Sequence, residues 1–377
     1  MYLLEFEAKG IVREIGVRIP RGFTFKSAEE LSGRLRELKF PVMLKAQVPI
    51  LNRASKGGVK KVNSEKEALK EAKRMFLSQF DGFKPKLILM EEYIPHKREL
   101  YLSLAVSPPK KRIIAIISKR GGAGIESSSK EMITIEEVDP IIGLKEFQCV
   151  ALANKLELPQ GLKFKAASIL RKMYSLMVKR DLKLIEINPL AISKDGDLYA
   201  LDVKVDVDED ALFRQEVGYK SLQLYKTKED EIAEEYGFFY VPLEGDIAVI
   251  GNGAGLVMAT LDLLSYYGGK PSCFIDIGGG ASSERVSKAI EVALSAKPRA
   301  LLINIFAGIT RCDEVAKGIS EAVKRLGVPP SMMIVRLTGT KEIEGGRILE
   351  KIGINFLLDM EKAVLKAVSL TKDDTHK

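Results

Sequence analysis

The second half of the chain alternates short, continuous apolar runs with segments in which apolar residues recur at helical spacing. The clearest helix carries one apolar stripe, formed by Val286, Ala289, Ile290, Ala293 and Leu294. Ser283 is the expected N-cap of this helix. The apolar runs are typical of strands buried on both faces, and they cover residues 247–250, 273–277, 301–306 and 332–337. This alternation predicts an α/β fold with a doubly wound parallel sheet covered by helices on both faces.

The first part of the chain has a more mixed pattern, which predicts an α+β arrangement. Strands are expected over residues 42–48, 86–92, 100–106, 112–118, 184–187 and 198–203. Helices are expected over residues 64–80 and 162–179. A charged stretch at 226–235, followed by Pro242 and Gly245, separates this part from the doubly wound part. We therefore predict two domains, residues 1–235 and residues 236–377.

The composition excludes several classes of protein. The chain has 377 residues, of which 46% are hydrophobic, with a formal net charge of +8 and three cysteines. These proportions exclude disordered chains and disulfide-stabilised scaffolds. The longest apolar runs are much shorter than the ~20 residues that span a bilayer, and the first residues lack the features of a secretory signal. We expect a cytoplasmic protein with no membrane partner and, because basic and acidic residues are interleaved, no nucleic-acid partner.

Histidine and cysteine offer little catalytic chemistry in this chain. His96 and His376 both lie in polar stretches and are predicted to be surface residues without a second ligand nearby. Cys149, Cys273 and Cys312 are too widely spaced for a zinc site and are predicted to be small buried hydrophobic residues. The chain is therefore expected to lack an internal histidine catalyst.

Glycine-rich loops follow the strands of the second half, at residues 251–255, 278–283 and 307–310. Each loop precedes a helix, where free backbone N–H groups and the helix dipole favour a carboxylate or a phosphate. The first loop has Leu256 where a dinucleotide fingerprint requires glycine, which disfavours a nicotinamide cofactor. The alternative is that the glycines only permit tight turns between strand and helix.

Two polar strand ends in the first part suggest a metal site. Strand alternation places Glu186 and Asn188 on one face, and it places Asp202 and Lys204 on one face of the next strand. The segment 193–197 between them is predicted to be a hairpin turn, which would bring Asn188 near Asp202. Such oxygen ligands suit Mg²⁺, which binds one or two protein groups together with phosphates and waters. The alternative is an edge hairpin with a solvated polar face.

Further charged residues of the first part fit a nucleotide. Lys45 lies inside the apolar strand 42–48, where an unpaired ammonium group is costly to bury, so it requires an anionic partner such as a phosphate. Glu91 and Glu92 end another strand, where a base or ribose could bind. The segment 53–58 is a basic loop with two glycines that could cover phosphates, although a charge run of this kind is often simply solvated.

Short motifs in a fixed order extend over nearly the whole chain. They lie at residues 44–48, 99–102, 186–190, 211–215, 252–256, 276–281, 304–306, 308–309, 311–313 and 335–337. In letters, order and spacing, these motifs resemble those of the β subunits of the succinyl-CoA synthetase family, the nucleotide-dependent succinate–CoA ligases. The resemblance implies an ATP-grasp domain over residues 1–235 and a flavodoxin-like ligase domain over residues 236–377.

The same resemblance implies roles for individual residues. Contacts to the nucleotide are implied for Lys45, Asn52, Arg53, Ala54, Glu91, Ile94 and Glu99. Mg²⁺ ligands are implied at Asn188 and Asp202, and a catalytic carboxylate near a travelling histidine is implied at Glu186. Substrate-binding loops of the second domain are implied at Asn252, Gly308, Ile309 and Thr310.

The implied activity is that of a succinate–CoA ligase of the tricarboxylic acid cycle, active only with an α subunit in a heterodimer or heterotetramer. ATP or GTP with Mg²⁺ would phosphorylate a histidine of the α subunit, which also holds most of the CoA site. The phosphohistidine would move to the second domain, where succinate becomes an acyl phosphate and CoA displaces phosphate. Two alternatives are a sister ligase for malate or a related dicarboxylate, and a catalytically degenerate subunit that only scaffolds its partner.

The chain departs from the family pattern at several positions. Residues 51–55, Leu-Asn-Arg-Ala-Ser, stand where relatives carry a glycine-rich Gly-Gly-Arg-Gly-Lys loop. Arg120 stands where a glutamate is common, Ala307 replaces a glycine, and Lys341 replaces an asparagine. The first departure leaves open whether this loop covers phosphates.

Overall fold

A computed structural model describes residues 2–50, 52–122, 132–215, 219 and 224–372. Leu51 and His376 lie outside these residues. The chain divides into two compact units, Met1–Tyr225 and Lys226–Lys377. This division precedes the predicted boundary at 235 and 236, because helix α7 (Lys228–Tyr236) packs on helix α9 (Ser283–Ser295) of the second unit.

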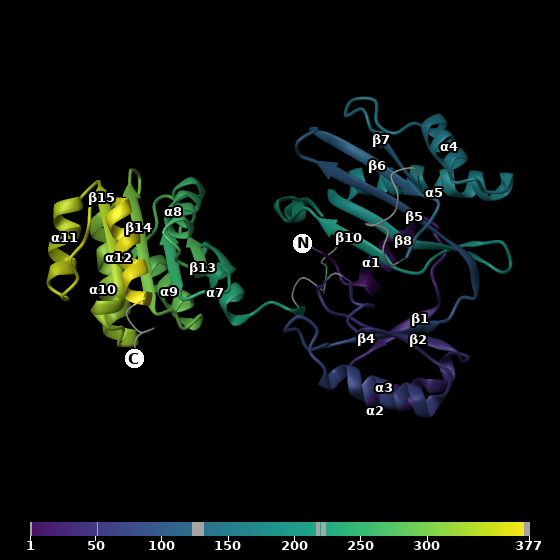
Figure 1. Cartoon of the computed structure of the whole chain (residues 1–377), viewed down its shortest axis with the longest axis horizontal. Helices are drawn as coiled ribbons and strands as arrows, with labels where there is room; N and C mark the ends of the chain where they lie inside the picture. Colours follow the sequence, from purple (N-terminus) through teal and green to yellow (C-terminus); the bar gives the residue numbers. More distant parts are fainter. Residues whose placement is uncertain (1, 51, 123–131, 216–218, 220–223, 373–377) are drawn as a thin grey trace. The chain divides into compact units, whose positions relative to one another are not determined.

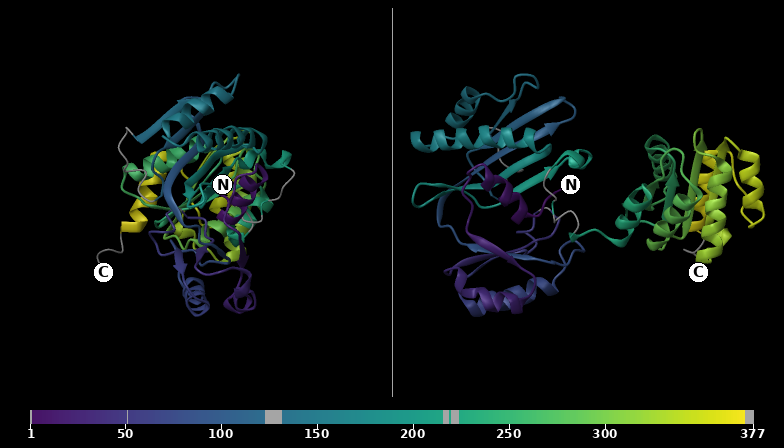
Figure 2. Two further views of the ribbon diagram at one scale, coloured as in Figure 1. Left: turned by 90° about the vertical axis from the view of Figure 1, so that its right-hand side faces the viewer. Right: turned by 180° about the vertical axis from the view of Figure 1, so that it is seen from behind.

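The first unit contains an antiparallel four-stranded sheet in the order β1-β4-β2-β3. Its strands are β1 (Gly22–Phe25), β2 (Val42–Ala46), β3 (Val59–Val62) and β4 (Ile88–Glu92). Helices α2 (Ala28–Arg34) and α3 (Glu65–Leu77) lie along one face, with the 3-10 helix η1 (Leu35–Glu37) between them in sequence (Figures 1 and 2). Apolar residues of the sheet and of both helices, such as Phe25, Leu31 and Met75, form one core, which leaves the other face of the sheet for polar contacts.

A second, antiparallel sheet of the first unit has the order β10-β8-β5-β6-β7, with β9 paired to β8. Its strands are β5 (His96–Ser107), β6 (Arg112–Ser118), β7 (Ile133–Glu137), β8 (Leu182–Ser193), β9 (Leu198–Ala200) and β10 (Val203–Val207). Helices α4 (Glu146–Lys155) and α5 (Gln160–Lys179) contribute to its core, and the 3-10 helix η4 (Glu209–Arg214) follows β10. Strand β8 is longer than predicted, because it pairs with β10 in its first half and with β9 in its second half.

Helix α1 (Glu5–Glu14) is an element of the first unit that the sequence analysis missed. Its apolar face, with Ala8, Ile11 and Val12, packs into the core of the second sheet. The residues just before the helix are tied to β10, since Leu3 N donates to Val205 O at 2.9 Å. This attachment fixes where the first turn of α1 presents its polar side chains.

The second unit is a five-stranded sheet in the order β11-β13-β12-β14-β15. The strands are β11 (Phe239–Pro242), β12 (Ile247–Gly251), β13 (Pro271–Asp276), β14 (Ala300–Ala307) and β15 (Met333–Gly339). All neighbouring pairs are parallel except β11 with β13. The remaining helices are α8 (Ala254–Tyr266), α10 (Cys312–Leu326), α11 (Glu342–Glu350) and α12 (Met360–Lys372), with the 3-10 helix η5 (Pro330–Met332) before β15.

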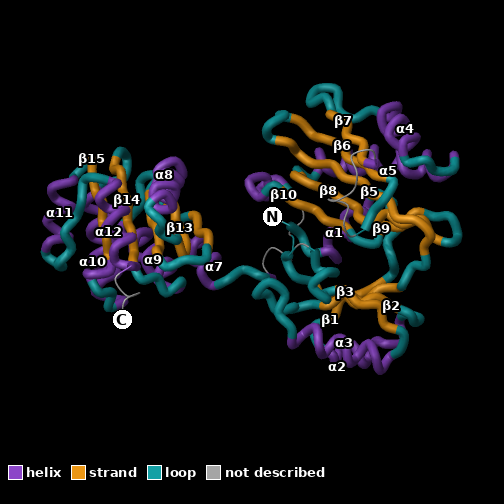
Figure 3. Tube along the Cα trace, in the orientation of Figure 1, coloured by secondary structure: helices purple, strands orange, loops and turns teal. Residues whose placement is uncertain are grey.

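Two separate cores confirm that this sheet is doubly wound. One core joins strand residues such as Ala248 and Ile303 to α9 and α10, and the other joins their neighbours Ile247 and Leu302 to α8 and α12. Alternate residues of each strand therefore face opposite helical layers. Figure 3 shows the strands of this unit with helices on both sides. The predicted N-cap Ser283 is wrong by one residue, because the Ser282 side chain accepts from Arg285 N and caps α9.

No helix in the part of the chain that the structure describes combines the length and apolarity that crossing a bilayer requires.

The predicted hairpin turn is confirmed, since Gly196 N donates to Ser193 O at 3.1 Å and Ser193 N donates to Asp197 O at 2.9 Å. All three cysteines are buried, as predicted, and burial raises the pKa of Cys149, Cys273 and Cys312 to about 11.

The contact between α9 and α10 depends on a glycine. A Cβ at Gly318 of α10 would lie 2.4 Å from Ser283 O and 2.7 Å from Val286 Cβ. We expect Gly318→Ala to destabilise the second unit by about 2 kcal/mol, because the overlap outweighs the better helix propensity of alanine. Gly255→Ala in α8 is the matched control, since a Cβ there meets nothing within 4 Å. Urea unfolding followed by circular dichroism measures both, and an equal stability of the two variants would contradict this packing argument.

Candidate functional site

A cavity of about 610 Å³ lies in the first unit, lined by residues of both of its sheets, and we call it the central cavity. Every residue predicted for the site of the first unit lines it: Lys45, Asn52, Arg53, Ala54, Glu91, Ile94, Glu99, Glu186, Asn188 and Asp202. These residues come from β2, β4, β5, β8, the end of the hairpin, the loop after β2 and the segment between β4 and β5. The fold thus gathers, around one space, side chains that are far apart in the sequence.

Six charged side chains form a buried charge network beside the central cavity, and all of them except Lys9 line it. They are Glu5 and Lys9 of α1, Lys45 of β2, Arg53 of the following loop, Glu91 of β4 and Asp202 before β10. Three carry positive and three carry negative charge. The side chains of Glu5, Lys9 and Glu91 are at most 3% exposed, so water does little to screen the charges.

Glu5 is the centre of this network. Its Oε1 atom is 2.7 Å from Lys45 Nζ and 2.8 Å from Lys9 Nζ, and its Oε2 atom is 2.8 Å from Arg53 Nη2. Glu91 pairs with the same lysines, at 2.5 Å from Lys9 Nζ and 2.7 Å from Lys45 Nζ. Each ammonium group therefore lies between two carboxylates, whose attraction offsets the cost of removing its charge from water.

The network shifts the pKa values of its members in directions that follow from the contacts. Burial alone would raise the pKa of Glu5, but the charges of Lys45, Lys9 and Arg53 outweigh it and hold this pKa well below the usual value. Burial would lower the pKa of Lys45, but Glu5 and Glu91 raise it above the usual value. Both groups are thus charged at neutral pH, which keeps the ion pairs intact.

The anionic partner predicted for Lys45 is present, and it consists of carboxylates of the protein itself. Lys45 Nζ also donates to Leu201 O at 2.6 Å, which ties β2 to the end of the hairpin. The carboxylate of Glu91 is engaged by Lys9 and Lys45, and its contact with a nucleotide stays a prediction. The sequence analysis did not identify Glu5 and Lys9 as residues of the site, because an acidic and a basic residue four positions apart are also typical of an exposed helix face.

The predicted pairing of the two polar strand ends is present. Asn188 N donates to Asp202 O at 3.1 Å, and β8 and β10 pair Glu186 with Lys204. Lys204 Nζ lies 3.0 Å from Glu186 Oε1, and Tyr101 Oη donates to Glu186 Oε2 at 2.8 Å. The carboxylate of Glu186 is therefore held from both sides while it lines the central cavity.

The donors of the predicted metal pair fit Mg²⁺ in chemistry. Asn188 offers an amide oxygen, which accepts from Gly122 N at 2.6 Å, and Asp202 offers a carboxylate that is 29% exposed. Burial and the nearby charge of Glu5 raise the pKa of Asp202, which a divalent cation would counteract. Among the described residues no group of three or more His, Cys, Asp or Glu could hold a metal, so phosphates and waters would have to complete a shell around these two residues.

The loop after β2 brings Arg53 into the network. Asn52 has a φ of 55°, in the left-handed region that asparagine tolerates better than most residues. Arg53 Nη1 donates to Ala46 O at 3.0 Å, and Arg53 O accepts from Gly58 N at 2.8 Å. The loop is therefore held by its own backbone and by Arg53, while Ala54 lines the central cavity and lies exposed.

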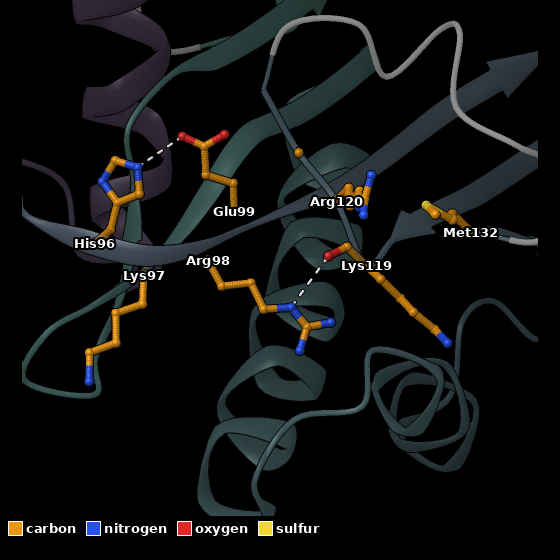
Figure 4. Close-up of a pocket in the computed structure, with 8 residues that line it drawn as sticks. His96, Lys97, Arg98, Glu99, Lys119, Arg120 and Met132 are labelled. Carbon is orange, nitrogen blue, oxygen red and sulfur yellow. Dashed lines mark hydrogen bonds and ion pairs between the residues drawn. The ribbon is translucent and has the colours of Figure 1, made fainter.

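The surface position predicted for His96 is wrong. Its side chain is 21% exposed and lines the central cavity, with Nδ1 2.8 Å from Ile94 O. Its Nε2 atom lies 2.9 Å from Glu99 Oε1 (Figure 4). The polar neighbours that suggested the surface instead surround a second cavity, of about 800 Å³, lined by Lys97, Arg98, Lys119 and Arg120. Arg98 supports its wall by donating to Lys119 O and to Leu156 O.

In the second unit, the glycine loops after β12, β13 and β14 are joined by side chains. Asn252 binds the backbone of Phe306 in both directions, because Nδ2 donates to Phe306 O at 2.9 Å and Phe306 N donates to Oδ1 at 2.9 Å. Thr310 Oγ1 accepts from Gly280 N at 2.9 Å. Two of the four predicted substrate residues therefore shape the loops, whereas Gly308 and Ile309 are exposed on them.

The loop amides of the second unit already bind a carboxylate. Asp276 Oδ1 accepts from Gly253 N at 2.6 Å and from Gly278 N at 2.8 Å. This contact agrees with the prediction that such loops favour an anion. The role of Asn252, Gly308, Ile309 and Thr310 in binding a substrate stays a prediction.

Comparison with known proteins extends over both units. A family model described as an ATP-grasp domain matches residues 2–192, and one described as CoA-ligase matches residues 250–370. An ADP-forming succinate–CoA ligase subunit beta of Pyrobaculum aerophilum is 41% identical over 381 residues, with 99% of this chain and all of that protein covered. The corresponding subunit beta 2 of Archaeoglobus fulgidus is 41% identical over 384 residues, with the same coverage of this chain.

A solved structure has a similar fold. ATP citrate lyase from Methanothrix soehngenii, determined with citrate and coenzyme A, has a TM-score of 0.74 and 18% identity. The match covers 98% of this chain and 99% of that chain. The family models and this structure confirm the predicted fold class.

Replacing Glu5 by glutamine should lower the free energy of unfolding by about 3 kcal/mol at neutral pH, because buried Lys9, Lys45 and Arg53 lose a charged partner. The depressed pKa of Glu5 makes this contribution depend on pH. It is fully present above the ordinary value of 4.5 and is lost as the pH falls toward the lower pKa of the folded state.

The difference in stability between the wild type and Glu5→Gln should therefore shrink as the pH is lowered below about 4.5. Urea titrations followed by circular dichroism measure it, because the chain has no tryptophan to report by fluorescence. A difference that stays constant from pH 7 to pH 3 would contradict the assigned charge state of Glu5.

The contact between Asn252 and Phe306 can be tested by amide exchange. Asn252→Ala removes both hydrogen bonds and should raise the exchange rate of the Phe306 amide by about tenfold, the effect of losing one hydrogen bond of ordinary strength. Asn252→Asp is the control, because it keeps the oxygen that accepts from Phe306 N. Equal exchange in all three proteins would show that Asn252 does not hold this loop.

Proposed function

The chain belongs to the family of succinate–CoA ligase β subunits, and from this membership we propose which steps its own residues perform. It is a subunit of an acid–CoA ligase of the ADP-forming type. We propose that the central cavity binds Mg²⁺ and ADP or ATP, and that the phosphoryl group passes between this nucleotide and a histidine of a partner α subunit. The observation that carries the proposal is the convergence of all residues predicted for nucleotide and metal on one cavity.

In this proposal Lys45 and Arg53 offset the negative charge of the phosphates. Their side chains line the central cavity and are fixed by hydrogen bonds to Leu201 O and Ala46 O. Fixed cations in a poorly screened site stabilise the charge of a transferring phosphoryl group without reorganising during the reaction. Asn188 and Asp202 would hold Mg²⁺, which neutralises phosphate charge when bound.

Glu186 has the position expected of a group that orients the partner's histidine. Its carboxylate lines the same cavity and is held by Tyr101 and Lys204, at 2.8 Å and 3.0 Å. A carboxylate that accepts from one imidazole nitrogen leaves the other nitrogen free to attack phosphorus. We infer that Glu186 orients the histidine when it receives the phosphoryl group, and that the triphosphate leaves as diphosphate.

The second unit would receive the phosphohistidine and the carboxylate substrate. We propose that the loops carrying Asn252, Gly308, Ile309 and Thr310 bind succinate and the phosphorylated imidazole, with CoA bound mainly by the α subunit. The Asp276 contacts support an anion-binding character for these loops. The alternative substrate is a dicarboxylate that resembles succinate. Ile309 is exposed on these loops, so we propose that its side chain contacts the acid and helps to select it.

A catalytically degenerate subunit is the less favoured candidate. A subunit that only scaffolds its partner would not need the buried charge network of Lys45, Arg53 and Asp202. Apolar side chains of similar volume would stabilise the cavity wall at least as well. The names of the relatives also agree with an active, ADP-forming enzyme.

The proposal is tested with this chain expressed together with its α subunit. We expect Asp202→Ala to lower the rate of histidine phosphorylation from Mg·ATP by about a hundredfold or more, because one of the two metal ligands is lost. Asp197→Ala is the matched control, since Asp197 lies in the same hairpin but pairs at the surface with Arg18 and Lys165. Labelling with radioactive ATP at normal rate in Asp202→Ala would refute the metal assignment, and no binding of Mg·ADP by the wild-type chain in calorimetry would refute the nucleotide site.

A further inference from the structure

The two cations proposed to meet phosphates already share an anion, the carboxylate of Glu5. This carboxylate is a hydrogen-bond acceptor of both Lys45, at 2.7 Å, and Arg53, at 2.8 Å. Glu5 also lines the central cavity together with Asn52, Ala54 and Asp202. A phosphate that approaches Lys45 and Arg53 therefore enters next to a fixed negative charge.

We propose that Glu5 is an affinity-determining residue of the nucleotide site, which weakens the binding of nucleotide phosphates by competing with them for Lys45 and Arg53. This inference rests on the proposed function, because it assumes that the central cavity binds Mg·ADP. It adds to that function a residue of α1 whose role is set by its charge.

Glu5 is held in place, so it does not retreat when an anion enters. Its side chain is 1% exposed and lies in the first turn of α1, which packs into the core through Ala8, Ile11 and Val12. Lys9, one turn later in the same helix, lies 2.8 Å from Oε1, whereas Arg53 is bound to Oε2. Charges at such distances inside a protein interact strongly, because little water screens them.

The cations do not depend on Glu5 alone for their positions. Lys45 is also bound by Glu91, at 2.7 Å, and by Leu201 O, at 2.6 Å. Arg53 is also bound by Ala46 O, at 3.0 Å, and by Asp202, at 3.2 Å. Removing the charge of Glu5 therefore leaves both cations in the cavity wall with one positive charge in excess, which favours an incoming phosphate.

A residue that weakens nucleotide binding suits a reaction that runs in both directions. Binding that is equally tight for substrate, product and transition state does not speed the chemical step, and it slows the departure of whichever nucleotide is the product. A built-in carboxylate keeps the cations charged and ordered between turnovers, yet it lets the nucleotide leave.

The test is isothermal titration of the full-length chain with Mg·ADP, for the wild type and three variants. We expect Glu5→Gln to bind Mg·ADP about tenfold more tightly than the wild type. Lys9→Met, which removes a positive charge from a residue that does not line the cavity, should bind severalfold more weakly. Glu7→Gln is the matched control for charge, since Glu7 lies in the same helical turn but does not line the cavity, and its affinity should equal that of the wild type.

Opposite signs for Glu5→Gln and Lys9→Met distinguish a role in affinity from structural damage, which would weaken binding in both. If Glu5→Gln does not fold, the double variant Glu5→Gln, Lys9→Met decides, because it removes one charge of each sign and should restore the affinity that Lys9→Met alone loses. Equal or weaker binding by Glu5→Gln, or no restoration in the double variant, would overturn this inference and leave the proposed function standing. Absence of Mg·ADP binding by the wild type would overturn both.

Discussion

The pairing of three buried cations with three carboxylates is the constraint on which the first unit depends. Each sheet of this unit has its own apolar core, and the charge network joins the polar faces between them: Lys45 comes from one sheet, Asp202 lies at the edge of the other, and Glu5 comes from a helix packed on the second. Breaking a buried ion pair on one side typically costs about 3–5 kcal/mol, because the remaining charge has no water to solvate it. The same groups that prepare the cavity for an anion therefore also hold its walls together.

Both units satisfy their anion-binding groups with a carboxylate of their own. In the first unit Glu5 lies between a lysine and an arginine, and in the second Asp276 accepts from the backbone amides of Gly253 and Gly278. The two solutions differ in strength, since the first uses full charges in a buried wall and the second uses peptide dipoles at the ends of strands. A reaction that moves a phosphoryl group between two sites is favoured when the anion-binding groups of each site are ordered before the phosphoryl group arrives.

Sequence patterns were sufficient for the doubly wound sheet and for the hairpin that brings Asn188 to Asp202, because both follow from local periodicity and turn chemistry. They were insufficient for α1, whose Glu5 and Lys9 have the spacing of an exposed ion pair and are buried only because β10 and β4 enclose them. His96 was misplaced for the same reason, since its polar neighbours line a cavity instead of the outer surface. The network's geometry is set by contacts between residues far apart in the chain, and a single sequence carries no direct record of such contacts.

The long sequence separation of these contacts has a consequence for how the protein is made. Lys45 donates to Leu201 O across 156 residues, and the segment before α1 is tied to Val205 of β10. While a ribosome is still synthesising the middle of the first unit, α1 lacks β10, the strand to which the preceding segment is tied. Contacts of this kind form slowly, because the chain between the two residues must first lose the entropy of closing a long loop. These long-range contacts of the first unit are thus completed late in biosynthesis, so a stalled or prematurely released chain would lack them even where its early strands had already folded.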